Sequence, residues 1–157
     1  MNWLPQLPRV ALRPGHRLCA PFLTSASRYS TVSVTLPPDI DFEELKQKLE
    51  DNKVTLIDVR VPRELHKVGR IPKSKNIILQ TLGPQILLPD EEFAVQLGFE
   101  KPSLDEPIVV SCLAGIRART AQLAMMAYGY NNVRVYAGSF EDWVQKGGPV
   151  EHPEAEI

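Results

Sequence analysis

The stretch of sequence that decides the fold reads PIVVSCLAGIRA and covers residues 107–118. It opens with a compact β-branched run, which is typical of a strand buried on both faces of a parallel sheet. It leads into a helix predicted over residues 118–128, with apolar positions at helical spacing and Gly129 as the C-cap. A cysteine therefore follows a buried strand and precedes a helix, at the sheet edge where α/β proteins place their ligand sites.

The rest of the chain continues this alternation. Strands are predicted at residues 32–35, 54–59, 76–78 and 132–136, and helices at residues 41–52, 63–68 and 140–146. Residues 81–98 hold further helical sequence, which Pro84 and Pro89 interrupt. The alternation predicts the α/β fold class, with one domain, a mainly parallel sheet and helices on both faces.

The first 29 residues differ in composition from the rest of the 157-residue chain. They contain four arginines and no acidic residue, and residues 24–31 are rich in serine and threonine. This composition resembles a mitochondrial transit peptide, whereas four prolines before residue 22 favour a disordered tail. A transit peptide predicts a mitochondrial protein, and a disordered tail predicts a cytoplasmic one. Without this segment the net charge is about -5, which argues against nucleic-acid binding, and no apolar run is long enough for a membrane span.

Cysteine is used sparingly, since only Cys19 and Cys112 are present. Cys19 would leave with a cleaved presequence, so neither a disulfide nor a cysteine-based metal site is expected. The loop after Cys112 can turn several backbone N–H groups toward an anion, and the helix after it adds the positive end of its dipole. Gly115 allows an unusual backbone conformation, and Arg117 offers a planar fork of donors. These features favour a reactive thiolate at Cys112 over a buried filler.

Three motifs in order resemble those of the rhodanese-like family, in its single-domain sulfurtransferase branch. The loop from Cys112 to Arg117 matches C-x-x-G-x-R, residues 57–72 resemble its I-D-V-R…E…G-H-I-P signature, and residues 136–150 resemble G-G-x-x-x-W…G-x-P-V. The resemblance implies a five-stranded parallel sheet in a domain over residues 32–150, followed by a tail over residues 151–157. It implies no cofactor and no metal.

The resemblance also implies the chemistry. Cys112 takes a sulfur atom from a small-molecule donor such as thiosulfate and passes it as a persulfide to a thiol, cyanide or sulfite. The substrate-binding residues are those that complete the loop: Leu113, Ala114, Gly115, Ile116 and Arg117. Asp58, at the end of a neighbouring strand, is expected either to support the loop amides or to act as a structural cap.

The chain departs from the family pattern at three places. Arg70 replaces a histidine, residues 73–75 replace a Gly-Ala pair, and Ser139 replaces the second glycine of the last motif. None is expected to touch the cysteine loop. Arg60 and Glu64, four positions apart, are expected to form a local ion pair.

Two other functions remain open. A phosphatase or arsenate-handling enzyme also binds an anion in such a loop, but tyrosine phosphatases need Cys-x5-Arg, and Arg117 is one position too close to Cys112. A non-catalytic or partner-dependent module would bind or relay a persulfide to an accepting protein. Members of that kind often lack the loop cysteine, which this chain retains.

Overall fold

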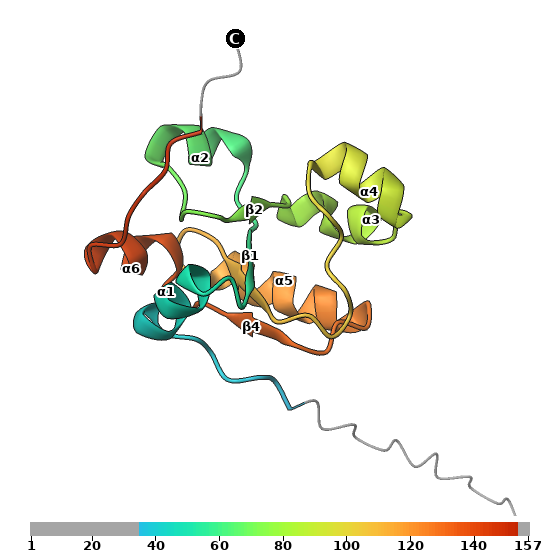
Figure 1. Ribbon diagram of the computed structural model, residues 1–157, viewed down its shortest axis with the longest axis horizontal. Coiled ribbons are helices and arrows are strands. Elements are labelled where there is room, and N and C mark those ends of the chain that lie inside the picture. Colours follow the sequence, from blue (N-terminus) through green and yellow to red (C-terminus); the bar gives the residue numbers. More distant parts are fainter. Residues whose placement is uncertain (1–34, 154–157) are drawn as a thin grey trace, which may run out of the picture. The chain divides into compact units, whose positions relative to one another are not determined.

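The computed structural model describes residues 35–153 and places four parallel strands in one sheet (Figure 1). The strands run in the order β2-β1-β3-β4. They are β1 (Thr55–Asp58), β2 (Lys75–Asn76), β3 (Ile108–Ser111) and β4 (Val133–Val135). The two central strands pair over their whole length, from Thr55 with Ile108 to Asp58 with Ser111. The predicted α/β class with a parallel sheet is confirmed.

The described residues also form six α-helices and one 3-10 turn. They are α1 (Phe42–Glu50), α2 (Pro62–Val68), η1 (Leu79–Thr81), α3 (Leu82–Ile86), α4 (Asp90–Leu97), α5 (Ile116–Ala127) and α6 (Ser139–Gln145). Of these, α1 precedes β1 and α6 follows β4. Asp41 caps the N-terminus of α1, because its carboxylate accepts the Glu44 N–H at 2.9 Å. The helix predicted from residue 118 begins two residues earlier, directly after Gly115. No helix of residues 35–153 is long and apolar enough to cross a membrane.

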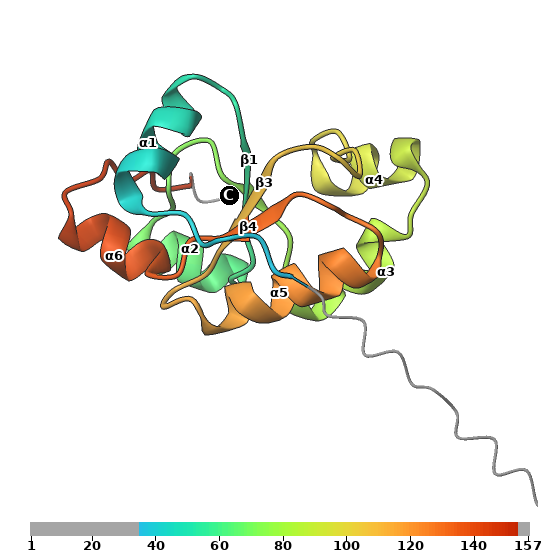
Figure 2. The ribbon, with the colours of Figure 1, turned by 90° about the horizontal axis from the view of Figure 1, so that it is seen from below.

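Two hydrophobic clusters pack on the two faces of the sheet. Side chains of α3, α4 and α5 cover one face, and side chains of α1 and α6 cover the other. Figure 2 shows α1 and α5 on opposite sides of the strands. The β-branched strand residues alternate between the two clusters, so Val110 faces the first and Val109 the second. The sheet is therefore buried on both faces, as its nearly continuous apolar strands predict.

Within residues 35–153 the sheet has four strands, whereas the resemblance implied five. Among the described residues, Ile40 alone adds to the sheet beyond β4, through a parallel bridge to Tyr136 in which the Ile40 N–H donates to the Val135 carbonyl at 2.9 Å. Pro37 and Pro38 lack the N–H groups that a longer strand needs, and α1 begins at Phe42. The strand predicted at residues 32–35 lies almost wholly outside the described residues, and Thr35 itself is not in a strand.

The last described residues fold back onto the turn after α2. Arg70 and Glu151 exchange backbone hydrogen bonds of 2.8 and 2.9 Å in an antiparallel bridge. Beside it, Gly69 has a φ of +87°, and a Cβ there would collide with Val150. The chain thus remains packed through Glu151, one residue beyond the predicted end of the domain.

Candidate active site

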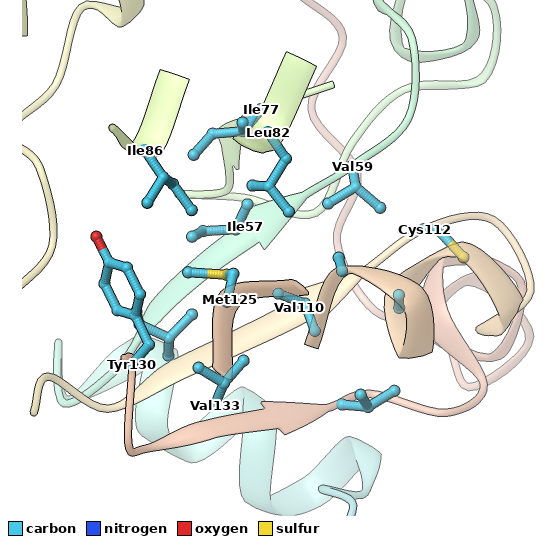
Figure 3. Close-up of a cluster of buried hydrophobic side chains, with 14 of the residues drawn as sticks. Ile57, Val59, Ile77, Leu82, Ile86, Val110, Cys112, Met125, Tyr130 and Val133 are labelled. Carbon is cyan, nitrogen blue, oxygen red and sulfur yellow. The ribbon is translucent and has the colours of Figure 1, made fainter. Parts of the chain in front are cut away.

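Cys112 is the first residue after β3, at the carboxyl edge of the sheet. Its side chain is 1% exposed and closes one end of the first hydrophobic cluster, with Tyr130 at the opposite end (Figure 3). Two backbone hydrogen bonds fix the loop to α6. The Phe140 N–H donates to the Cys112 carbonyl at 3.1 Å, and the Glu141 N–H donates to the Leu113 carbonyl at 3.0 Å. The backbone that carries the thiol is therefore held at a fixed place.

The Gly115 N–H points at this thiol, with 3.0 Å between the nitrogen and the Cys112 Sγ. This loop shape requires glycine, because φ is +98° and a Cβ would collide with the carbonyl oxygen of Ala137. The helix α5 starts at the next residue, so the positive end of its dipole lies beside the sulfur. An amide donor and a helix N-terminus therefore lie together at this sulfur, an arrangement that can bind an anionic group.

Ser139 also contacts the cysteine, contrary to the expectation that none of the three departures touches the loop. Its hydroxyl accepts the Cys112 N–H at 3.0 Å, donates to the Tyr136 carbonyl at 2.8 Å and lies 3.9 Å from the Cys112 Sγ. The side chain is fully buried. The position of Ser139 along the chain did not predict this contact, because it is the turn between β4 and α6 that brings Ser139 back to the loop.

Arg117 is paired with Glu64 rather than standing free. Its two terminal nitrogens lie 2.7 and 2.8 Å from the two carboxylate oxygens. The hydrogen bonds and charge of Arg117 lower the pKa of Glu64, and those of Glu64 raise the pKa of Arg117. The predicted Arg60–Glu64 pair is therefore wrong. Helical i, i+4 spacing does not apply to those residues, because α2 begins only at Pro62.

Asp58 forms a buried ion pair with Arg60 instead of contacting the loop amides. The Asp58 carboxylate accepts hydrogen bonds from the Arg60 side chain at 2.7 to 3.0 Å and from the Arg60 N–H at 3.0 Å. The guanidinium also donates to the Gly69 carbonyl at 3.0 Å and lies 4.2 Å from the centre of the Phe140 ring. Asp58 thus stabilises the turn after β1, which is the structural role that was one of the two alternatives expected for it.

Two of the remaining loop side chains are exposed, whereas Leu113 is half-buried against the second hydrophobic cluster. Ala114 is exposed and Ile116 is 82% exposed. Leu113 lines a hollow of about 470 Å³ beside the cysteine loop. Most of its lining side chains are apolar, and one carboxylate and one amide complete it: Val68, Leu113, Phe140, Glu141, Val144 and Gln145. The loop therefore presents the Gly115 N–H to the sulfur, while the side chains of Ala114 and Ile116 lie on the surface.

Two residues of this site, Glu64 and Ser139, were not predicted from the sequence to belong to it. Glu64 belongs to a motif but lies 53 positions from Arg117, and Ser139 lies 27 positions from Cys112. The only sequence signal for Ser139 was its replacement of a glycine that the family usually keeps. A buried hydroxyl at such a position is a reason to look for a polar contact.

Comparison with known proteins identifies this arrangement. The family described as the rhodanese-like domain matches residues 41–146, most of the described chain. The chain belongs to the rhodanese-like family. A human single-domain sulfurtransferase, TSTD1, has a similar structure, with a TM-score of 0.67 and 30% identity over 72% of this chain and 100% of that one.

Curated relatives agree with the structural match. The mitochondrial thiosulfate sulfurtransferase RDL2 of Saccharomyces cerevisiae is 33% identical over 75% of this chain and 80% of its own length. The thiosulfate:glutathione sulfurtransferase of Homo sapiens is 33% identical over 69% of this chain and 95% of its own. This rhodanese-like chain is a sulfurtransferase by class.

Proposed function

We propose that the protein loads the outer sulfur of thiosulfate onto Cys112 and passes it to a thiol. In the first step the Cys112 thiolate attacks the outer sulfur, the sulfur–sulfur bond of thiosulfate breaks, and sulfite leaves with the bonding electrons. In the second step an acceptor thiolate attacks the outer sulfur of the persulfide and Cys112 leaves as a thiolate. Cyanide or sulfite can replace the thiol in this step.

The observation that carries this proposal is the Gly115 N–H at 3.0 Å from the Cys112 Sγ, at the N-terminus of α5. An amide donor and the helix dipole stabilise negative charge on sulfur before, during and after transfer. The backbone of residues 113–117 forms the binding loop, and the cationic Arg117 attracts anionic donors. Relatives named for thiosulfate and for glutathione support this choice of donor and acceptor.

The acceptor approaches over the hollow beside Leu113. Its apolar side chains suit the carbon skeleton of a thiol, and Glu141, which also lines it, suits an ammonium or amide group. A cysteine thiol of a partner protein fits the same surface. The sulfur can then be transferred to that protein thiol, which becomes a persulfide, in place of a small-molecule thiol. Steady-state rates with glutathione and with a reduced protein thiol, each at several concentrations, distinguish the two acceptors.

The place of action is the mitochondrion. The arginine-bearing, acid-free composition of residues 1–29 supports this, as does a relative named as mitochondrial. Import into isolated mitochondria should yield a mature form beginning near Ser30. A full-length product that is not imported, and that added protease therefore degrades, would contradict this location and favour the cytoplasm.

Intact-mass measurement tests the sulfur transfer itself. After incubation with thiosulfate, the full chain should gain one sulfur atom, and peptide mapping should place it on Cys112. The Cys19→Ser variant serves as the matched control and should load normally. Cys112→Ser should neither load nor turn over, and an active Cys112→Ser variant would overturn the proposal.

A further inference from the structure

Ser139 combines three features that packing alone does not explain. It is fully buried, it carries a hydroxyl where the family pattern has glycine, and its φ of +52° is a conformation that serine rarely adopts. A buried non-glycine residue in this region costs conformational energy, which is compatible with a role for the side chain. The side chain contacts the backbone and the sulfur of Cys112.

The hydroxyl has one proton and two places to direct it. In the structure it donates to the Tyr136 carbonyl at 2.8 Å, while the Cys112 Sγ lies 3.9 Å from the oxygen. The Tyr136 carbonyl also accepts the Ser139 N–H at 3.0 Å. That carbonyl therefore keeps a partner when the hydroxyl turns away, so the proton can move to the sulfur without leaving an unsatisfied acceptor.

We propose that Ser139 is a positioning residue whose hydroxyl turns from the Tyr136 carbonyl to the Cys112 sulfur whenever that sulfur is a thiolate. This inference rests on the proposed persulfide chemistry of Cys112. In the discharged enzyme the negative charge is on Sγ, where a hydroxyl donor stabilises it. In the persulfide the charge lies on the outer sulfur, and the hydroxyl returns to the carbonyl. Throughout, the same oxygen accepts the Cys112 N–H and holds the loop.

The consequence for the reaction differs between its two steps. During discharge Cys112 is the leaving group, so a hydrogen bond to its thiolate accelerates the step. During loading Cys112 is the nucleophile, and the hydrogen bond raises the thiolate fraction while lowering the reactivity of each thiolate. Loss of the hydroxyl should therefore slow discharge at every pH and slow loading only at lower pH.

The other charged groups around the loop do not change in this comparison. They are Arg117 on α5, Glu64 on α2, Glu141 on α6, and Asp58 with Arg60 at the end of β1. Arg117 and Glu64 pair with each other, and so do Asp58 and Arg60. A shift caused by replacing Ser139 alone is thus assigned to its hydroxyl.

The test measures Cys112 in a full-length Cys19→Ser background, where it is the sole thiol. The rate of alkylation by iodoacetamide is followed against pH in Ser139→Gly and Ser139→Ala. Both variants lose the hydroxyl, whereas only glycine removes the backbone strain. We expect the midpoint of the pH–rate profile to rise by about one pH unit in both, and single-turnover discharge to glutathione to slow about tenfold.

Ser111→Ala is the matched control, because the Ser111 hydroxyl is also buried next to Cys112 but has no hydrogen-bond partner among the described residues. The midpoint of the pH–rate profile of Ser111→Ala should equal that of the Cys19→Ser parent. An unchanged midpoint in Ser139→Gly would overturn the inference, as would a shift in Ser139→Ala alone, which would indicate strain rather than hydroxyl loss. Alkylation does not require turnover, so these outcomes are separate from failure of the Cys112→Ser test of the proposed function.

Discussion

Arg117 on α5 and Glu64 on α2 form an ion pair with two hydrogen bonds, at 2.7 and 2.8 Å between nitrogen and oxygen. The two side chains are 33% and 28% exposed, so the pair is open to solvent on one side. The arginine that the loop motif supplies is thus oriented by a residue from a different motif. An anionic donor that uses the Arg117 fork must share it with Glu64 or displace that carboxylate.

Replacing Arg117 tests its part in loading. Arg117→Ala should lower the single-turnover rate of loading by thiosulfate about 10- to 100-fold, because a charge-assisted contact is lost. Arg117→Lys should recover only part of the rate, since lysine keeps the charge but not the fork. Arg119→Ala is the matched control, because Arg119 lies on the same helix and also pairs with a carboxylate, that of Asp39. Equal loading by Arg117→Ala and Arg119→Ala would remove Arg117 from donor binding.

The same ion pair predicts a pH dependence of stability. Arg117 lowers the pKa of Glu64 below its ordinary value of 4.5 in the folded state. The stabilisation is therefore complete above pH 4.5 and is lost as the pH falls through the lower folded value. The difference in unfolding free energy between wild type and Glu64→Gln should be small and constant near neutral pH and should shrink in acid. Urea titrations at several pH values measure it, and a difference that grows in acid would contradict the assignment.

Gly115 should tolerate no side chain. Gly115→Ala adds a Cβ that collides with the Ala137 carbonyl oxygen, so the loop must move and the N–H at 3.0 Å from the sulfur moves with it. We expect loading to fall about 100-fold, the effect typical of removing one donor of an anion site. Gly98→Ala is the control, since its φ is +75° but no atom lies within 4 Å of the added Cβ. It should cost about 1–2 kcal/mol in thermal or urea unfolding and leave loading unchanged.

Removing one partner of the buried Asp58–Arg60 pair should lower the unfolding free energy more than replacing both partners with apolar residues. Asp58→Ala leaves a fully buried guanidinium without its carboxylate and should lower the unfolding free energy by about 3–5 kcal/mol. The double variant Asp58→Leu/Arg60→Met removes both charges and should lose less. Urea unfolding of both variants measures this coupling. A double variant less stable than Asp58→Ala would show that the contacts of Arg60 with Gly69 and Phe140 matter more than its charge.

Loop length should separate sulfur chemistry from phosphate chemistry. A tetrahedral phosphate needs a wider ring of N–H groups than a single sulfur atom does. Wild type should therefore transfer sulfur and show no significant activity on aryl phosphates. One glycine inserted after Ala114 should displace the Gly115 N–H from the sulfur and impair transfer. Robust phosphatase turnover by wild type, or undiminished sulfur transfer by the folded insertion variant, would show that the length of the loop does not select the reaction.

Local patterns were sufficient for the framework of the fold. The runs at residues 54–59 and 107–111 are apolar on both faces of a strand, and the helix after Cys112 has clear periodicity, so the α/β class and the cysteine at a strand end were predictable. The fifth strand stays a prediction, because residues 32–35 lie almost wholly outside the described residues, within which only Ile40 pairs beyond β4.

The polar contacts around the cysteine were not predictable from the sequence. Arg117 has Glu64 as its partner, and Cys112 has Ser139 as its partner, through turns whose geometry no local periodicity encodes. Charge spacing led instead to a pairing of Arg60 with Glu64 that the start of α2 forbids. Side-chain partners over such separations depend on the completed fold.

The pairing of Thr55 with Ile108 also has a consequence for how the chain is made. The two central strands lie 53 positions apart, so β1 leaves the ribosome long before the strand that pairs with it. Until then one edge of β1 is unpaired and its apolar residue Ile57 lacks the covering helix α5, a state that favours aggregation. Nascent chains stalled before residue 108 should therefore depend on chaperones, and those released after Glu151 should not.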